Sequence, residues 1–321
     1  MSGKLPHADP SAANRFAAYD RSVVRVLAVS DVVEEGLWAD IGPARGADLI
    51  LACGDLPFEY LGYLMNALDV PLVFVPGNHD ADLSGYRLSR AGLTLRAGLP
   101  ARPPWPDGAV SADGRVVDAA GLRIAGLGGS RRYRPGPNQY SDRQQACRAR
   151  WLAARIRLHG MTPRQLRGRP RRGRSHRLDV LLTHAPPRGV GDGTDPVHQG
   201  FPALNVLAGR LQPPLLLHGH VDLDPARGRD HWLGRTLVRN VTGWQLFDLE
   251  PATGRVVDVT GHHSAGYNSA SHNSAAHHGA SHNSAGHTRA GHTRAGYTRA
   301  GSTRLGHHGA GHNHGGDRDA R

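Results

Sequence analysis

The chain has 321 residues, a formal net charge of +12 and two cysteines, Cys53 and Cys147. This length allows one large domain or two small ones, whose core needs neither a disulfide framework nor a structural zinc. No apolar stretch approaches the roughly 18 residues of a membrane span, and the start of the chain lacks the apolar segment of a signal peptide, so we expect a cytoplasmic protein without membrane contact.

The positive charge is unevenly distributed. Seven arginines and no acidic residue lie between Arg164 and Arg177, and the segment 261–321 adds six arginines against two aspartates. The rest of the chain is therefore close to neutral. A solvated loop is the simplest interpretation of the arginine run, and nucleic acid is an alternative partner that we do not expect.

In chain order, residues 1–22 read as a polar leader, and residues 23–260 alternate apolar runs with turns, as a folded domain does. Helices are predicted at Leu61–Leu68 and at Ser141–Leu158, the second with Ser141 as its N-cap. The segment 164–177 is predicted to be a disordered insertion. Late apolar runs near 236–241, 244–249 and 256–259 suit a second sheet that closes the body.

The final segment, 261–321, repeats in fives, as in GHTRA and SHNSA, and holds twelve of the 21 histidines. It has little apolar surface to bury, so we expect a disordered tail. Closely spaced imidazoles bind borderline metals weakly, which makes metal storage one hypothesis for this tail. A repeat expansion without a selected role is the other.

Five polar clusters, each directly after an apolar run, dominate the body of the chain. They are Ser30-Asp31, Gly54-Asp55, Gly77-Asn78-His79-Asp80, Thr183-His184 and His218-Gly219-His220-Val221-Asp222. The preceding runs, such as VVRVLAV and PLVFVP, are typical of buried parallel strands. Because ligands bind at the carboxyl ends of the strands in an open α/β sheet, we expect the clusters to converge on one rim. Their carboxylate, carboxamide and imidazole groups predict a site for two divalent metals.

The chemistry of the side chains indicates which metal each would bind. Two metals about 3.5–4 Å apart need a bridging carboxylate, and Asp55 is the candidate because Gly54 lets the backbone turn sharply after its strand. Asp31, at the end of the first strand, would bind the first metal. The second metal would be completed by one amide oxygen and two ring nitrogens, those of Asn78, His184 and His220.

His79 directly follows a predicted ligand and would lie over the site without binding metal. Its imidazole would stabilise a phosphoryl oxygen or protonate the leaving alcohol, which makes it the predicted catalytic residue. Asp80 would orient it as a hydrogen-bond partner.

The order of these clusters resembles that of the calcineurin-like metallophosphoesterase superfamily over about residues 23–250. The most specific part is the pairing of Gly54-Asp55 with the Gly-Asn-His-Asp of 77–80. The resemblance implies a four-layer α/β/β/α sandwich with two mixed sheets and two metals between the sheet rims. It also implies hydrolysis of a phosphomonoester or phosphodiester by a hydroxide held on the metals.

Two positions depart from the family pattern. Val33 stands where the family has the histidine of Asp-x-His, and Asp222 stands where it has the second histidine of Gly-His-x-His. Both missing imidazoles belong to the first metal, which would be left with Asp31, Asp55 and Asp222. An oxygen-only shell favours Mn²⁺ or Mg²⁺ over Zn²⁺, with iron as a further alternative, and this first site is expected to be weak or empty.

A Gly-rich turn at 126–130 follows the apolar run LRIA. It lacks the Lys-Ser/Thr of a P-loop and the third glycine of a dinucleotide fingerprint, so a tight turn at the end of a strand is the simpler interpretation. The alternative is a wall of the substrate site, in which Arg131, Arg132 and Arg134 would contact phosphate.

We therefore predict a metal-dependent phosphoesterase that acts on a small phosphoester. The alternative is a catalytically impaired protein that keeps the fold and one metal and serves as a binding or scaffold protein. Under that alternative Val33 and Asp222 mark the decay of the first metal site.

Overall fold

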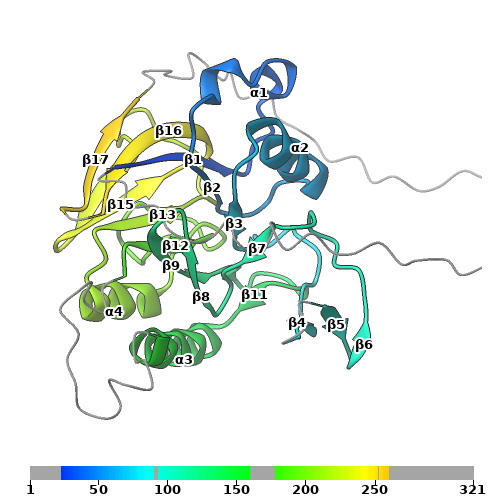
Figure 1. Cartoon of the computed structure of the whole chain (residues 1–321). Helices are drawn as coiled ribbons and strands as arrows, with labels where there is room; N and C mark the ends of the chain where they lie inside the picture. The colour runs from blue at the N-terminus through cyan, green and yellow to red at the C-terminus, as the bar shows by residue number, and fades with distance from the viewer. Residues whose placement is uncertain (1–22, 90–92, 160–177, 252, 260–321) are drawn as a thin grey trace, which may run out of the picture. The chain divides into compact units, whose positions relative to one another are not determined.

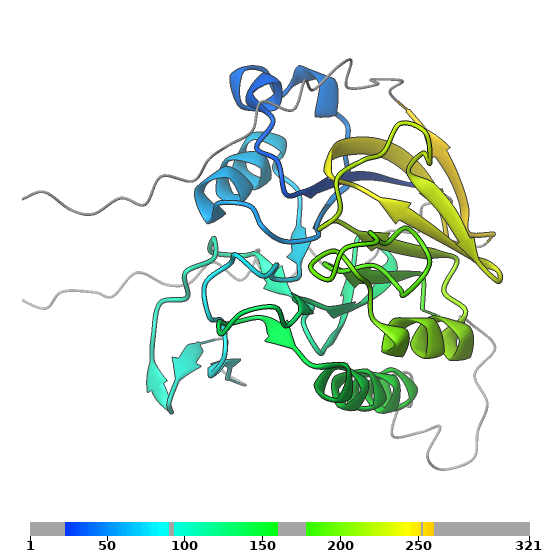
Figure 2. The same ribbon diagram turned by 180° about the vertical axis from the view of Figure 1, so that it is seen from behind.

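The structure is a computed structural model that describes residues 23–89, 93–159, 178–251 and 253–259. The predicted leader 1–22, the arginine-rich insertion 164–177 and the tail 261–321 lie outside the described residues. Within the described body, two six-stranded mixed sheets lie against each other (Figures 1 and 2).

The first sheet carries three of the five predicted strands, in parallel and side by side. Its order is β17 (Arg255–Asp258), β16 (Gly243–Glu250), β1 (Val24–Ser30), β2 (Leu49–Ala52), β3 (Leu72–Phe74) and β7 (Val110–Ser111). The second sheet carries the other two, β12 and β13, also parallel. Its order is β14 (Asp230–Leu233), β15 (Thr236–Asn240), β13 (Leu215–His218), β12 (Val180–Thr183), β9 (Leu122–Leu127) and β8 (Val116–Ala119).

Alternation along the strands creates three hydrophobic layers. On β1, Val26 and Ala28 face the second sheet, whereas Leu27 and Val29 face the helices α1 (Glu35–Ala39) and α2 (Phe58–Leu68). On the outer face of the second sheet, α3 (Asp142–His159) and α4 (Pro202–Leu211) cover a third cluster. The predicted four-layer α/β/β/α sandwich is confirmed. Cys53 is a buried, free cysteine in the central layer, as its position in an apolar run predicts.

Two details of the predicted strand arrangement were wrong. The clusters end strands of two different sheets, so they meet between two rims and not along one. The late runs do not form a second sheet together. Only β15 joins the second sheet, whereas β16 pairs antiparallel with β1 over seven residues and extends the first. Apolar patterning fixes which residues are buried, but the choice of partner strand depends on contacts distant in sequence.

Both predicted helices are confirmed, with their starts set by local chemistry. α2 begins three residues earlier than predicted, at Phe58 after Pro57. Before α3, the Ser141 hydroxyl accepts a hydrogen bond from the Gln144 amide (3.2 Å), and the Gln144 side chain accepts one from the Ser141 amide (2.9 Å). This reciprocal pair is a capping box. None of the helices in the described part of the chain is long and apolar enough to cross a bilayer.

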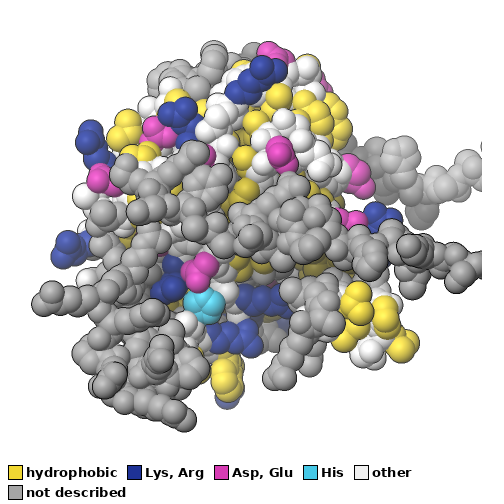
Figure 3. Space-filling view, viewed as in Figure 1, with side chains coloured by type: hydrophobic (Ala, Val, Ile, Leu, Met, Phe, Trp, Pro, Cys, Tyr) yellow, Lys and Arg dark blue, Asp and Glu magenta, His cyan; other side chains and the backbone are white. Residues whose placement is uncertain are grey.

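The remaining elements are short. A three-stranded sheet contains β4 (Tyr86–Leu88), β5 (Thr94–Arg96) and β6 (Leu99–Pro100), a two-stranded one contains β10 (Ser130–Arg131) and β11 (Gln139–Tyr140), and η2 (Gly42–Ala44) is a 3₁₀ turn. On the face shown in Figure 3, acidic and basic side chains are interspersed over the described surface.

Candidate metal centre

The polar clusters meet where the rims of the two sheets approach each other. The Asp31 amide donates to the Gly54 carbonyl (3.1 Å) within the first sheet, and the Gly219 amide donates to the His184 carbonyl (3.0 Å) within the second. Across the rims, the His220 amide donates to Asp31 Oδ2 (2.9 Å). Asp31, Asp55 and His220 all have a left-handed backbone, with φ of 63°, 57° and 67°. Such conformations are costly for non-glycine residues and cluster at functional sites.

Gly219 is required by the close approach of the two rims. A Cβ atom at this position would lie 2.0 Å from Ser30 Oγ and 2.1 Å from Asp31 Oδ2. Only glycine lets the backbone before His220 pass so close to the end of β1. The glycine of this Gly-His pair therefore brings the second sheet's ligand up to the first sheet's carboxylate.

Potential ligand atoms of Asp55, His184 and His220 lie within 4.8 Å of one another. The ring centroids of the two histidines are 4.9 Å apart. His184 Nε2 lies 3.0 Å from Asn78 Oδ1 and 3.3 Å from Asp55 Oδ2. The four residues predicted to hold the second metal are thus brought together by the fold, with two oxygens and two imidazoles facing a common space.

Hydrogen bonds on the far side of each ring leave one nitrogen available to a metal. His184 Nδ1 donates to the Cys53 carbonyl (2.7 Å), so Nε2 carries the lone pair when the ring is neutral. His220 Nε2 donates to the Val197 carbonyl (2.9 Å), which leaves Nδ1 as the free nitrogen. Backbone carbonyls commonly fix ligating histidines in this way.

Electrostatics at His184 favour a positive charge in this space. Burial opposes the charged ring, but the hydrogen bond and charge of Asp55 outweigh it and raise the pKa of His184 to about 9. Burial, reinforced by the charge on His184, lowers the pKa of His220 to about 3. A proton on His184 Nε2 therefore lies between two acceptors, Asn78 Oδ1 and Asp55 Oδ2. A divalent ion satisfies the same acceptors, so the donor set fits a metal.

Asp31 lies beside this group but outside the cluster of three. Its Oδ2 accepts from the Ser30 hydroxyl (2.5 Å) and from the His220 amide. Burial raises the pKa of Asp31 above its ordinary value. A partly buried carboxylate of this kind is stabilised by a nearby cation, which agrees with its predicted place beside a metal.

His79 is exposed over the site, and its backbone amide donates to Asp55 Oδ1 (2.7 Å). Contrary to our prediction, no hydrogen bond joins Asp80 to the His79 ring in the described structure. Asp80 Oδ2 accepts from the backbone amides of Gly77 (2.7 Å) and Asp55 (3.0 Å), and so ties the loop after β3 to the loop after β2. Asp80 thus positions the Asp55 carboxylate and not the His79 imidazole.

The two positions that depart from the family pattern lie outside the cluster. Val33 packs against the hydrophobic layer under α1 and α2. Asp222 is exposed and is not among the described residues whose ligand atoms cluster. The ligand role of Asp222 stays a prediction.

The three arginines predicted to bind substrate have different surroundings. Arg131 donates to Gln199 Oε1 (2.5 Å) and to Asp142 (3.2 Å), and Arg132 donates to the Gln139 carbonyl and to Gln144. Only Arg134 reaches a predicted site residue. Its guanidinium lies 3.4 Å from His79 Nδ1.

Gly128 and Gly129 of the Gly-rich segment connect β9 to β10 and lie against the loop after β3. A Cβ atom on Gly128 would lie 2.4 Å from the Pro76 carbonyl oxygen, and the Gly129 amide donates to that oxygen (2.8 Å). The turn thus supports the loop that carries Asn78.

Two contacts at the site were missed by sequence reasoning. The Tyr133 hydroxyl accepts a hydrogen bond from Asn78 Nδ2 (3.2 Å). The His198 ring lies 5.3 Å from the His220 ring and bonds Asp195 through Nδ1 (2.9 Å). Neither residue belongs to a strand-end cluster, so the pattern used to find the site carried no signal for them.

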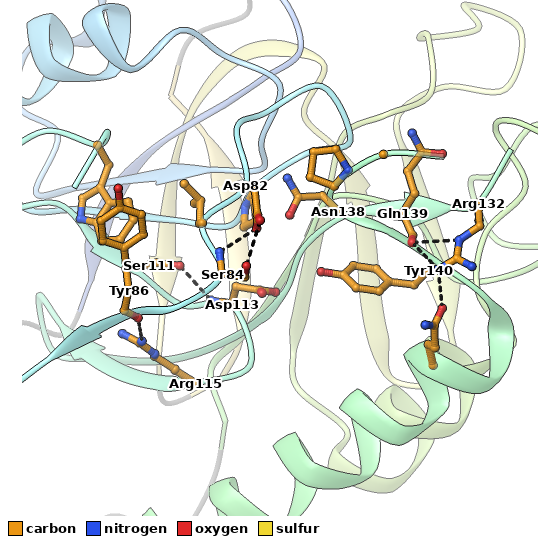
Figure 4. A pocket seen from close by; sticks show the side chains of 16 residues that line it. Asp82, Ser84, Tyr86, Ser111, Asp113, Arg115, Arg132, Asn138, Gln139 and Tyr140 are labelled. Carbon is orange, nitrogen blue, oxygen red and sulfur yellow. Dashed lines mark hydrogen bonds between the residues drawn. The ribbon is translucent and has the colours of Figure 1, made fainter. Parts of the chain in front are cut away.

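A pocket of about 360 Å³ shares the loop after β3 with the metal centre. Pro76 and Asp82 line it from this loop, and Asn138 and Tyr140 line it from β11 and the residue before it. Figure 4 shows Asp82, Asn138 and Tyr140 around this pocket. Arg132 also borders this pocket. Its guanidinium is bonded to Gln139 and Gln144, whereas that of Arg134 lies beside His79.

The model of the calcineurin-like phosphoesterase family matches residues 24–224. The chain belongs to this family. Membership implies metal-dependent phosphoester hydrolysis in general, and family members bind divalent metals. The matched range includes every predicted site residue. No curated protein matches the chain.

Several solved structures are similar to this phosphoesterase chain. The protein TT1561 of Thermus thermophilus is 16% identical, covers 73% of this chain and 97% of its own, and has a TM-score of 0.41. The sulfate thiohydrolase SoxB of the same genus, in complex with glycerol, is 18% identical over 70% of this chain and 40% of its own, with a TM-score of 0.31. GAP50 of Plasmodium is 9% identical, covers 74% of this chain and 89% of its own, and has a TM-score of 0.38. Family membership rests on the sequence match.

Proposed function

We propose that this protein hydrolyses a small phosphoester, mono- or diester, at a divalent metal held by Asp55, Asn78, His184 and His220. The observation that supports this proposal is the convergence of these four side chains, with His184 Nε2 between Asn78 Oδ1 and Asp55 Oδ2. Mn²⁺ is the proposed metal, with Fe²⁺, Zn²⁺ and Mg²⁺ as alternatives. The proposed location is the cytoplasm.

A bound divalent ion would supply Lewis-acid polarisation of the phosphoryl oxygen and a lowered pKa for water. The residues around it have separate tasks. Asp55 and Asn78 contribute oxygens, and the two histidines contribute the nitrogens left free by Cys53 and Val197. Asp31 adds negative charge beside this group, where a second ion would need it.

His79 is the proposed proton donor to the leaving oxygen. Its backbone amide holds it against Asp55, and its ring is exposed on the side from which substrate would enter. The Arg134 guanidinium donates to His79 Nδ1, which favours the tautomer with its proton on Nε2. Arg134 also offers a charged group to a phosphate oxygen next to His79.

A catalytically impaired protein with the same fold is the second candidate. The specific observation in its favour is that Val33 is packed in a hydrophobic layer and Asp222 is exposed, so neither replaces the missing imidazoles of the first metal. Under this proposal the remaining metal serves binding or stability.

Hydrolysis of bis-p-nitrophenyl phosphate and p-nitrophenyl phosphate by chelator-stripped, Mn²⁺-reloaded protein tests the proposal. We expect turnover that requires the metal and is lost in Asp55→Asn, whereas the surface variant Asp107→Asn keeps it. Absence of turnover of both esters with Mn²⁺, Fe²⁺, Zn²⁺ and Mg²⁺ would exclude hydrolysis of these substrate classes and favour the impaired protein.

A further inference from the structure

Two loops outside the strand-end clusters contact the candidate metal centre. Residues 131–139 lie against the loop that carries Asn78, and residues 192–200 lie against His220. We call these the Asn78-side loop and the His220-side loop.

The Asn78-side loop contacts three successive residues of the Asn-His-Asp motif. The Tyr133 hydroxyl accepts from Asn78 Nδ2, the Arg134 guanidinium reaches His79 Nδ1, and Asn138 Nδ2 donates to the carbonyl of Asp80 (3.1 Å). The contact to Asn78 matters most, because the amide torsion of asparagine is broad and must be held for Oδ1 to face a metal. Tyr133 holds the plane of this amide.

Tyr133 is itself held by a buried side chain. Gln139 is 3% exposed, and its Oε1 accepts from the backbone amides of Tyr133 (3.3 Å) and Arg134 (3.2 Å). Only the oxygen of this carboxamide is bonded, because its Nε2 has no hydrogen-bond partner in the described structure. This oxygen fixes the backbone of two residues that contact the motif.

The His220-side loop performs the matching task for the second sheet. The Val197 carbonyl accepts from His220 Nε2, and the next residue, His198, lies against the same ring. These contacts set both the tautomer and the orientation of the His220 imidazole.

One hydrogen bond joins the two loops. Arg131 donates to Gln199 Oε1 at 2.5 Å, and its other terminal nitrogen donates to Asp142 at the start of α3 (3.2 Å). The side chain of Arg131 is 28% exposed. A substrate-binding role predicted for Arg131 from sequence is therefore less suited to its geometry than a structural link between the loops.

We propose that Tyr133, Arg131 and Gln199 are positioning residues, which form a tie between the two loops and thereby hold Asn78 and His220 in the geometry that binds the metal. This deepens the proposed function, on whose metal site it rests. The tie acts on the ligands and does not touch substrate. Its loss should weaken metal binding, and excess metal should restore turnover.

Isothermal titration calorimetry with Mn²⁺ on the full chain tests whether the tie supports metal binding. The variants are Tyr133→Phe, Gln199→Leu and Gln199→Glu. Tyr133→Phe removes only the hydroxyl, Gln199→Leu breaks the tie, and Gln199→Glu keeps an acceptor for Arg131. Tyr86→Phe is the matched control. It also removes a tyrosine hydroxyl bonded to an arginine, but this pair, Tyr86 on β4 and Arg96 on β5, belongs to neither loop.

We expect Tyr133→Phe and Gln199→Leu to weaken Mn²⁺ binding about 10-fold or more, the usual effect of losing a partner of a metal ligand. Gln199→Glu and Tyr86→Phe should stay within about twofold of the parent. With bis-p-nitrophenyl phosphate, KM should be unchanged and kcat should recover in excess Mn²⁺.

Unchanged Mn²⁺ affinity in Tyr133→Phe and Gln199→Leu would overturn the proposal, as would equal losses in Gln199→Leu and Gln199→Glu. A parent protein that binds Mn²⁺ without hydrolysing either ester would contradict the proposed function alone. The Mn²⁺ affinities of parent and variants would still show whether the tie supports metal binding. A parent that binds no Mn²⁺ would contradict both.

Discussion

Gly77 lies so close to Asp55 that a Cβ atom on Gly77 would be 2.0 Å from Asp55 Oδ1 and 2.6 Å from the Asp55 amide nitrogen. The backbone of the loop after β3 thus packs directly on the carboxylate that follows β2. This contact, together with Asp80 Oδ2 bonded to the amides of both residues, fixes Asp55 relative to Asn78.

Gly77→Ala is expected to disturb the metal centre and the fold together. The added methyl group must push the Asp55 loop away, at a cost of about 1–3 kcal/mol or more. Thermal unfolding and Mn²⁺ titration should both register the loss. Gly36→Ala on α1 is the control, since nothing lies within 4 Å of its Cβ position, and a helical alanine stabilises by about 0.5–1 kcal/mol. A Gly77→Ala protein with normal Mn²⁺ affinity would show that this contact does not position Asp55.

Arg134→Gln is expected to raise the KM for a phosphoester about 10-fold with a smaller change in Mn²⁺ affinity. The guanidinium beside His79 is the one among the three predicted arginines that reaches a site residue. Steady-state kinetics with bis-p-nitrophenyl phosphate measure this KM. The increase reflects the loss of a charge-assisted hydrogen bond to phosphate, which contributes about 1.5–3 kcal/mol when its geometry is good.

The comparison variant for Arg134 is Arg132→Gln. Arg132 donates to the Gln139 carbonyl and Gln144 and lines the pocket of Figure 4, so its loss should leave KM unchanged. Equal increases of KM in the two variants would argue for a general effect of positive charge and against a specific contact by Arg134.

The strand-end ligands could be predicted from sequence because each is encoded locally. A short apolar run followed by a polar residue places that residue at a rim, whatever the partner strand is. The convergence of Asp55, Asn78, His184 and His220 was predicted in this way, and their role as ligands stays a prediction. The same locality explains Ser141, whose capping box needs only the three residues that follow it.

Features that depend on distant pairs were not predictable in this way. The direction of the Arg131 side chain is set by Gln199, 68 residues away. The assignment of β16 to the first sheet depends on its register with β1, such as Val26 opposite Phe247. Tyr133 follows no strand-end pattern, and its contact with Asn78 spans 55 residues.

Metal binding should release a proton from His184. Without metal, the pKa of His184 is raised to about 9, so the ring is charged at pH 7, whereas a pKa of about 3 keeps His220 neutral. Metal must displace the proton, so affinity should rise as pH increases toward about 9 and then level off. Titration calorimetry in buffers of different ionisation enthalpy measures the release. Binding without proton uptake by buffer at pH 7 would contradict the assignment of His184 as a ligand.

The raised pKa of His184 also predicts how the stability of the metal-free protein changes with pH. Because the folded pKa of about 9 lies above the ordinary value of 6.5, the stabilisation is fully present below pH 6.5 and is lost as pH rises through about 9. Metal-free protein should therefore lose thermal stability between these values. Mn²⁺-loaded protein should not, because the ion replaces the proton.

The purified protein should bind about one Mn²⁺ per chain tightly, and a second ion only weakly. The predicted ligands of the second metal converge, but Val33 packs against a hydrophobic layer and Asp222 is exposed, so neither position offers Asp31 an imidazole for a first metal. Elemental analysis after dialysis measures the ratio of Mn²⁺ to protein.

Asp222→His should tighten binding of the more weakly held ion and move the preference of that site toward zinc, because imidazole suits zinc better than a hard carboxylate shell does. Asp224→His, two residues further along the same loop, is the control. It should change neither the affinity for the weaker ion nor its metal preference. Two tightly held ions in the unaltered protein would mean that the oxygen ligands of the first site suffice, and the idea of a degenerate site would have to be dropped.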